Sequence, residues 1–478
     1  MPAYGLRRMA TIAAALGGMG VPCLASAQPL TLQQTVAYAM SHNAAIAAKQ
    51  AVLAQAESDY TRQRATEYPP VVASLQNLLE KQNNYAGTLA QYGVAPIPNF
   101  SLNTAQIGTQ WTVYNGSLNQ ILTQQNLRKV EEAKAELRET QTQTTEKLVE
   151  MFFAIADRQH HYDLAQANLI YQQALLTVAQ AKQKAGLIAG VDVLRAEIGV
   201  EQTQAALLIS QSDGETAREL LVQTIGAARD TQFAVPAALP QPSLPAGSPA
   251  TLIGIAEHNQ PAVAAALAGV AVAQLMGSGI DSDLLPQINV FASFGNQTSP
   301  TGFVDSQNQI DLLNQECATN PHQIACIGFP FANVARGTPG FWDIGATSTL
   351  SFPIVDWGTR AAEHRAANQA IASAKLALSL ARTIAEDEVT QSLREAQTAV
   401  ETLAYQRTAA DLGTRAARIA QEQYANGLLS LTDTKAAQAT SLQTQADFYS
   451  AQIGYISAVV KLRSALGTYD PAATVADL

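Results

Sequence analysis

The chain has 478 residues but few charges: Lys, Arg, Asp and Glu make up 14% of it, against about a quarter in average soluble domains. It also lacks a basic surplus, because 29 Lys and Arg face 39 Asp and Glu, for a net charge of −10. Nucleic-acid binding requires a basic stripe that releases counterions. The composition therefore excludes a nucleic-acid partner and fits a compact soluble enzyme poorly.

Long apolar runs are also missing after the N-terminus. The closest stretch, 262–276, is rich in Ala and contains Gln274. A membrane-spanning helix requires about 20 mostly apolar residues. If the mature chain enters a membrane, we expect it to do so with β-strands.

The first 27 residues read as an export signal. Arg7 and Arg8 precede a weakly apolar run, and Ala25-Ser26-Ala27 forms a small-residue cleavage site before Gln28. We expect a signal peptide over 1–27 and a mature chain without a lipid anchor, because Gly-Val-Pro before Cys23 is a poor lipid-attachment context.

Cysteine is scarce, and only Cys317 and Cys326 remain in the mature chain. An exported protein meets an oxidising compartment, so a local disulfide is the default expectation and free thiols are the alternative. His322 lies between them, but a structural zinc site takes four ligands and only three are at hand. We therefore expect no metal site and no cofactor.

The chain contains two copies of one plan. A shift of 241 residues aligns 179–205 with 420–446 and gives ten identities in 27 positions. A shift of 216 pairs His42-Asn43 with His258-Asn259, and a shift of 242 pairs Gly116 with Gly358. The second copy therefore carries 26 extra residues between Pro286 and Val355, the stretch that contains both cysteines.

Each copy is predicted to contain a helix, two strands joined by a loop, a very long helix, a tight turn and another helix. We expect the first repeat over 28–226, with strands near 71–80 and 104–115 and helices 116–185 and 192–226. A Pro-rich linker follows over 227–250. The second repeat covers 251–467, with strands near 286–296 and 342–354 and helices 358–426 and 433–466, before a C-terminal tail over 468–478.

The long helices are the most distinctive elements. No Pro or Gly lies between Gly116 and Ala185, and a helix over this span would be about 105 Å long. Its counterpart is interrupted only by Gly413. Helices of this length must pack lengthwise against neighbours, either as a rod-like coiled coil or as a cylinder of helices.

The strands favour the cylinder. Ile107, Thr109, Trp111 and Val113 alternate with small or polar residues, as in outer-membrane barrel strands of about ten residues. The third strand departs from this pattern with Phe291 on the polar side. Four strands cannot close a barrel, whereas three copies supply twelve and leave a channel.

Several short motifs occur along the chain: Leu30-Thr31-Leu32, Ala37, Ala39, Asn43, Tyr68-Pro69-Pro70, Phe352 to Gly358, the two interhelical turns and Ala465-Leu466-Gly467. Through these motifs the chain resembles the outer-membrane efflux protein (TolC-type) family over nearly its whole mature length. The resemblance implies a mainly α fold with transmembrane β: a trimeric twelve-stranded β-barrel continued by a long periplasmic α-helical barrel. It also implies a role as export duct that works with a periplasmic adaptor and an inner-membrane transporter.

In such proteins the interhelical turns form the periplasmic tip, which meets the adaptor and closes the duct. The resemblance assigns Gly186, Leu187, Asp192, Gly427 and Leu428 to the adaptor-facing turns. It assigns Tyr424 and Asp433 to the aperture, although Asp192 and Asp433 could equally serve as helix starters. The family's second carboxylate and its arginine are replaced here by Ala436 and Leu429.

No catalytic residues are expected. His160 and His161 are adjacent, so on a helix they point about 100° apart and make a poor ligand pair. No nucleophile elbow, phosphate-binding glycine loop or paired metal motif occurs. The alternative function is a periplasmic coiled-coil adaptor or structural scaffold without a pore.

Overall fold

The computed structural model describes residues 29–80, 100–236, 238–298, 340–351 and 353–468. The signal peptide, Cys317, His322, Cys326 and the tail after Thr468 lie outside the described residues, so the disulfide remains a prediction. Contacts divide the chain into two compact units. The first comprises Met1–Ala48, Glu139–Asn259 and Glu386–Leu478, and the second comprises Lys49–Arg138 and Gln260–Ala385.

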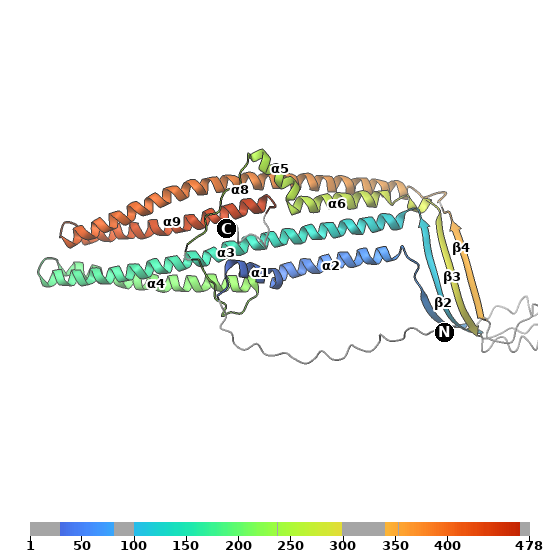
Figure 1. Cartoon of the computed structure of the whole chain (residues 1–478), viewed down its shortest axis with the longest axis horizontal. Coiled ribbons are helices and arrows are strands. Elements are labelled where there is room, and N and C mark those ends of the chain that lie inside the picture. The colour runs from blue at the N-terminus through green and yellow to red at the C-terminus, as the bar shows by residue number, and fades with distance from the viewer. Residues whose placement is uncertain (1–28, 81–99, 237, 299–339, 352, 469–478) are drawn as a thin grey trace, which may run out of the picture. The chain divides into compact units, whose positions relative to one another are not determined.

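The first unit is helical. In Figure 1 helix α3 (Leu118–Lys184) lies beside α4 (Gly190–Ile225), and α8 (Thr359–Ala425) lies beside α9 (Leu431–Ala465). The two long helices, α3 and α8, each have 67 residues and cross from one unit into the other. The absence of Pro from both spans lets each helix continue, and α8 runs through Gly413 without a break.

The largest core of this unit surrounds α3. Leu148, Phe152 and Phe153 are fully buried there, with the two rings packed edge to face. The surrounding side chains come from helices α1 (Leu32–His42), α4 and α9 and from the linker. The linker is held by a parallel bridge between Leu30 and Phe233, whose ring meets Phe152 edge-on. Burial of these aromatics joins the linker to both repeats.

Each repeat opens with two helices where the sequence predicts one. In the first repeat, Asn43 adopts an extended conformation after α1, and its side-chain oxygen accepts from the N–H groups of Ala45 and Ile46 to start α2 (Ala44–Ala65). In the second repeat, α5 (Pro249–Asn259) stops before Pro261, the first residue of α6 (Pro261–Ser278). A capping side chain and a proline at the first helical position each favour a new helix start.

The second unit carries a four-stranded antiparallel sheet in the order β1-β2-β3-β4, seen in Figure 1. Its strands are β1 (Val72–Glu80), β2 (Phe100–Asn115), β3 (Gln287–Thr298) and β4 (Gly340–Thr349). β4 ends at Thr349, so the strand expected to reach residue 354 is too long. Thr349 pairs with Gln287, the first residue of β3, so no partner remains beyond it, and Pro353 has no N–H to donate.

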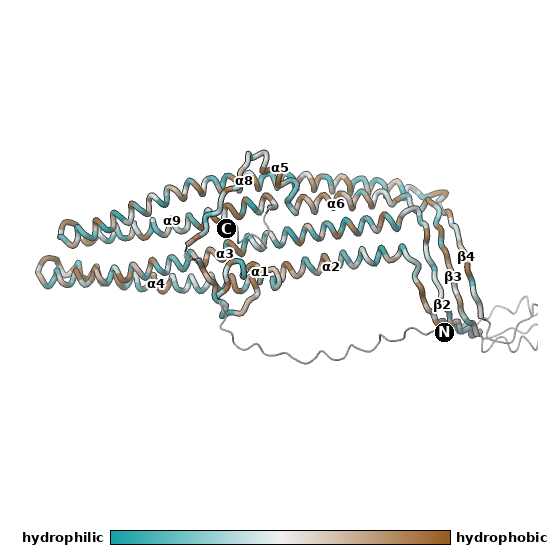
Figure 2. The backbone as a smooth tube through the Cα atoms, viewed as in Figure 1, coloured by the Kyte–Doolittle hydropathy of each residue, from teal (hydrophilic) through white to brown (hydrophobic). Residues whose placement is uncertain are grey.

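The sheet has one apolar and one polar face. Residues that pair across antiparallel strands share a face, and Ile107, Phe294 and Trp342 form one such row. Their exposures are 57%, 69% and 76%. Brown and teal segments alternate along the strands in Figure 2. The opposite face carries small and polar side chains, including Gln106, Ser293 and Asp343.

Phe291 is a large apolar residue of β3 on this mostly polar face. It pairs with Gly345, and a Cβ atom at Gly345 would overlap the Phe291 ring. The ring thus covers the surface that the glycine leaves open. Gly345 is what allows an aromatic residue on the polar side.

One helix needs a correction to the sequence analysis. Among the described residues, the span Pro261–Leu284 is apolar and long enough by length and composition to cross a membrane. Such a span is weak evidence, because core helices pass the same test. The end of α6 packs through small residues: a Cβ on Gly277 would lie 3.3 Å from Ile371 of α8, and one on Gly279, just after the helix, 3.5 Å from Leu118 of α3. The C-terminal end of α6 is therefore packed against α3 and α8 within the second unit.

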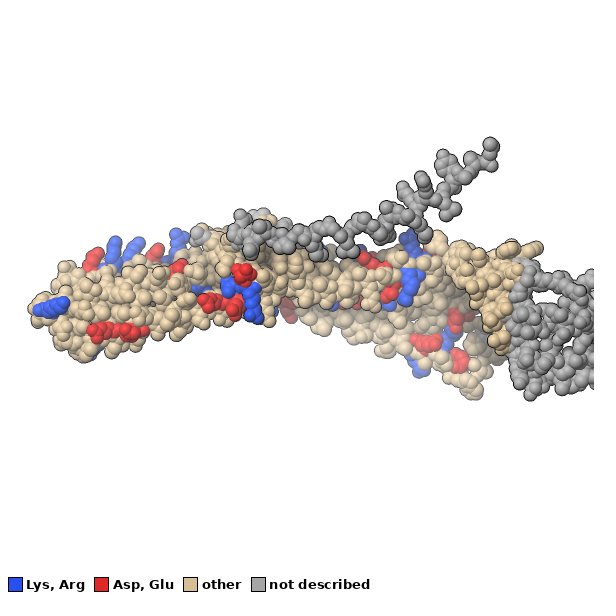
Figure 3. Space-filling view, turned by 90° about the horizontal axis from the view of Figure 1, so that it is seen from below, with Lys and Arg blue, Asp and Glu red and all other residues tan. Residues whose placement is uncertain are grey.

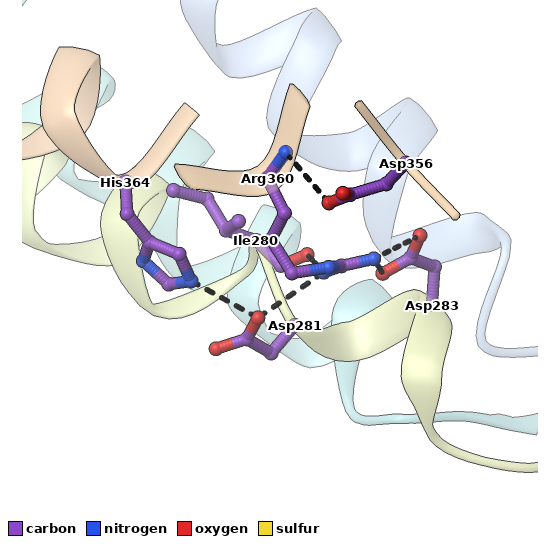
Figure 4. A network of polar contacts seen from close by, with 6 residues as sticks. All are labelled: Ile280, Asp281, Asp283, Asp356, Arg360 and His364. Atoms are coloured by element: carbon purple, nitrogen blue, oxygen red, sulfur yellow. Dashed lines mark hydrogen bonds and ion pairs between the residues drawn. The ribbon is translucent and has the colours of Figure 1, made fainter. Parts of the chain in front are cut away.

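Charged side chains form scattered groups separated by wide uncharged areas in Figure 3. One ionic group joins the turn after α6 to the start of α8. Arg360 donates to both oxygens of Asp283 at 3.1 Å, to Asp281 at 3.1 Å and to the carbonyl of Ile280 at 2.9 Å, as Figure 4 shows. His364 lies 3.1 Å from the same Asp281 carboxylate. This network fixes the junction between helix and sheet in the second repeat.

Candidate functional site

The candidate site is the pair of interhelical turns in the first unit. Gly186 and Gly427 both have positive φ, 77° and 74°. The N–H of Leu187 donates to the carbonyl of Lys182, and the N–H of Leu428 donates to that of Gln423, at 2.9 Å in each case. This is the Schellman pattern, in which a left-handed glycine ends the helix. The 241-residue repeat thus produces two turns of the same construction.

The residues after the turns differ between the repeats. Helix α9 starts with Ser430, whose hydroxyl accepts from the N–H of Asp433 at 3.1 Å and donates to its carboxylate at 2.6 Å. Helix α4 starts at Ala189, which offers no side-chain cap. Asp192 and Asp433 are therefore the third residues of their helices, in the first turn, and neither is the N-cap. Ser430 is the cap that the sequence analysis missed.

The two carboxylates also differ in their partners. Asp192 accepts from Arg195 at 3.3 Å, and its side chain is 30% exposed. No described cation forms an ion pair with Asp433. A carboxylate in either position interacts favourably with the helix N-terminus. Of the two, only Asp433 has no ionic partner among the described residues.

Tyr424 lies in the apolar cluster between the turns, 6% exposed, with Leu175, Val193 and Leu431. Burial, and then the negative charge of Asp192, raises the pKa of Tyr424. Its hydroxyl is buried and finds no hydrogen-bond partner among the described residues. Tyr424 therefore joins the two turns by packing, with its hydroxyl unsatisfied.

Two lysines connect the repeats near the turns. Lys182 donates to the carbonyl of Tyr424 at 2.6 Å, and its ammonium lies 4.0 Å from the centre of the Tyr424 ring. Lys435 donates to the carbonyl of Arg195 at 2.6 Å, and burial lowers the pKa of Lys435. Sequence reasoning missed both, because each lysine binds a backbone carbonyl about 240 residues away and no side-chain motif marks such an acceptor.

A hollow of about 540 Å³ opens between the turns. Its lining includes Lys182, Asp192, Arg195, Tyr424 and Ser430. The outer residues of the turns are apolar, since Leu187 is 72% and Leu428 77% exposed. The tip thus combines a polar seam between the repeats with two exposed leucines.

His160 and His161, the described histidines weighed as a ligand pair, have different surroundings. His160 stacks on Tyr449 with ring centres 4.0 Å apart, whereas His161 faces the carbonyl of Asp157 at 2.9 Å. In the part of the chain that the structure describes, no group of three or more His, Cys, Asp or Glu side chains could hold a metal ion. The two adjacent histidines therefore do not act as a ligand pair.

The chain is similar to known proteins at two levels. The family model described as outer membrane efflux protein matches residues 36–227 and 252–468, one match in each repeat. No curated protein sequence matches the chain.

Solved structures share the fold at low sequence identity. The CmeC outer membrane channel of Campylobacter jejuni has a TM-score of 0.72 and 14% identity, with 93% of this chain and 88% of that chain covered. The MtrE outer membrane channel of Neisseria gonorrhoeae, in its open state, has a TM-score of 0.70 and 17% identity, with coverage of 91% and 88%. The outer membrane protein VceC of Vibrio cholerae has a TM-score of 0.69 and 16% identity, with coverage of 91% and 96%.

The family match covers both repeats and most of the chain. This family consists of efflux channels and is not an enzyme family. The chain therefore belongs to the outer membrane efflux protein family and is an outer-membrane export duct.

Proposed function

We propose that three copies of this chain form the outer-membrane channel of a tripartite efflux or type I secretion system. The channel receives its cargo from an inner-membrane transporter through a periplasmic adaptor and performs no chemistry of its own. In the trimer, twelve strands close a barrel in the outer membrane, and the long helices form a periplasmic duct.

The observation that carries this proposal is the two-faced open sheet. Its apolar face exposes Ile107, Phe294 and Trp342, and its order leaves β1 and β4 as edges. In a bilayer every backbone polar group needs a protein partner, so open edges must pair with another copy. A soluble adaptor or scaffold, the alternative, would leave this apolar face in water.

The aperture is the second part of the proposal. Three copies of Asp433 would crowd their unpaired charges at the tip and attract cations. Tyr424 would close the space between the two turns of each copy. Gly186, Leu187, Asp192, Gly427 and Leu428 form the turns that would meet the adaptor, and the exposed leucines suit an apolar contact.

Fractionation tests the assignment. We expect the mature protein in the outer-membrane fraction, and after detergent extraction a mass three times that of one chain. Recovery of a monomer in the soluble periplasm would contradict the channel and favour the scaffold.

A further inference from the structure

The segment between β4 and α8 holds the most exposed large apolar side chains of the described residues. Ile354 and Trp357 are each 94% exposed, and Val355 is 61% exposed. Trp357 also has a φ of 52°. A bulky residue rarely adopts this left-handed conformation, because its Cβ crowds the backbone.

The polar side of the same segment is firmly held. The Asp356 carboxylate accepts from the N–H of Gly358 at 3.0 Å and from the N–H of Arg360 at 3.3 Å. Arg360 in turn binds Asp281 and Asp283 in the network of Figure 4. These bonds fix the turn, so the surrounding structure maintains the unfavourable conformation of Trp357.

The first repeat shows that such a turn does not require tryptophan. By backbone conformation, Gly116 and Ser117 (φ 66° each) correspond to Trp357 and Gly358 (φ 52° and 84°), so Gly116 takes the place of Trp357 and Asn115 that of Asp356. Asn115 caps its own helix by accepting from the N–H of Asn119 at 3.2 Å. Glycine therefore suffices at this position of the junction, and the indole of Trp357 needs another explanation.

The position of Trp357 relative to the strands explains why an indole lies there. It follows β4 at the end of the sheet where Tyr114 of β2 also lies, while Trp342 lies seven residues before the end of β4. Seven strand residues span about 23 Å, close to the apolar band of about 25 Å between the two aromatic girdles of outer-membrane barrels. Trp342 and Trp357 thus lie toward opposite ends of such a band.

We propose that Trp357, with Ile354 and Val355, anchors the channel in the headgroup region of the periplasmic phospholipid leaflet. Indole rings favour this region because one end is apolar and the N–H can meet water. The apolar face of the sheet ends beside the segment, so the lipid contact continues from one to the other. This inference rests on the proposed membrane insertion of the sheet.

The test uses the full mature chain in phospholipid vesicles and two variants that each retain one tryptophan. Trp111→Phe with Trp342→Phe retains Trp357, and Trp111→Phe with Trp357→Phe retains Trp342 as the control. Each is reconstituted with lipids brominated either near the headgroup or deep in the acyl chain. We expect shallow bromines to quench Trp357 at least about twofold more strongly than deep bromines.

The outcomes distinguish the anchoring role of Trp357 from the insertion of the sheet into the membrane. Quenching of Trp342 at either depth without quenching of Trp357 would overturn the anchor while leaving the channel in the membrane. Quenching of neither would overturn the inserted sheet itself. If a double variant fails to fold, wild type is compared with Trp357→Phe alone. Weaker quenching by the shallow bromines in Trp357→Phe supports the anchor. The same quenching in both proteins at both depths overturns it.

Discussion

Lys182 links the two repeats at the tip through one hydrogen bond to the carbonyl of Tyr424 and one contact with its ring. Lys182→Gln shortens the side chain and removes the charge. If this link stabilises the closed tip by about 1 kcal/mol, its loss raises the population of channels with an open tip about fivefold. Single-channel conductance in planar bilayers measures this directly.

Lys184→Gln is the matched control, since Lys184 is exposed in the same last turn of α3. It removes the same charge without breaking the link to Tyr424. Equal conductance changes in both variants would mean that charge alone, and not the bond between the repeats, holds the tip.

Asp433 and Asp192 occupy equivalent positions but have different partners. Asp433→Asn keeps Ser430 as the cap, so folding should be unchanged, and it removes one unpaired charge per copy. We expect block of the pore by divalent cations to weaken by at least about tenfold, because a ring of like charges concentrates counterions. Asp192→Asn should have a smaller effect, because Arg195 already offsets that charge.

Equal effects of these two substitutions on cation block would show that both repeats contribute alike to the aperture. No effect of either would leave both aspartates with a role at the helix start only. The measurement is the blocking concentration of Mg²⁺ at a fixed voltage.

The sequence could predict the repeated turns but only part of their chemistry. Gly186 and Gly427 were recognisable because a left-handed helix end strongly favours glycine. Ser430 was missed because Asp433, three residues later, is an equally common helix-start residue. Lys182 and Lys435 could not be found, because their acceptors are carbonyls that carry no residue-type signal.

At the scale of elements, β3 and β4 meet through Phe291 and Gly345. A Cβ on Gly345 would overlap the Phe291 ring, so Gly345→Ala forces the ring away and should cost about 1–3 kcal/mol, as overpacking typically does. Adding Phe291→Leu should recover part of this loss, since neighbouring substitutions couple.

The thermal stability of the purified channel measures both variants. Gly254→Ala in α5 is the control, because a Cβ there meets nothing within 4 Å. Equal losses for the single and double variants would show that Phe291 is not the neighbour that requires glycine.

Helices α3 and α9 meet where His160 stacks on Tyr449. Burial, and then the charge of His161, lowers the pKa of His160. The unfolded chain therefore binds a proton before the folded one, so stability is complete above the ordinary histidine pKa of 6.5 and declines as the pH falls below it.

We expect the melting temperature to drop between about pH 7.5 and pH 5.5, and to drop less in His160→Gln. His161→Gln, in the same helix, should retain more of the slope because His161 is not the stacked ring. An identical slope in wild type and His160→Gln would assign the pH dependence to other groups.

The elements were predictable where periodicity or composition is uniform over many residues. Two 67-residue helices follow from long spans of good helix formers without proline. The end of β4 was not predictable from the alternation of its own residues, because the strand ends where Thr349 pairs with Gln287, the first residue of β3. The break at Asn43 was missed for a similar reason: its amide also donates to the carbonyl of Thr224, a contact set by tertiary structure.

For the whole molecule, the decisive question is how the open sheet closes. Each chain offers β1 and β4 as edges, and rotational symmetry lets β4 of one copy pair with β1 of the next until the ring is complete. Two copies would give eight strands with an interior filled by side chains, whereas three give twelve and a channel. The twelve-stranded ring is thus the smallest assembly that both removes the edges and conducts.

Engineered cysteines at the two edges test this closure. In a Cys317→Ser and Cys326→Ser background, Ser74→Cys in β1 is combined in turn with Asp343→Cys or Thr347→Cys in β4, all on the polar face. Adjacent strands hold Cα atoms about 4.5–5.5 Å apart, within the range that a disulfide spans. We expect oxidation to give a covalent trimer in the register that brings the two cysteines opposite each other.

Covalent dimers as the largest product would instead indicate an eight-stranded ring. Non-reducing gels without any cross-linked species in either register would show that β1 and β4 do not meet, as expected for a scaffold without a pore.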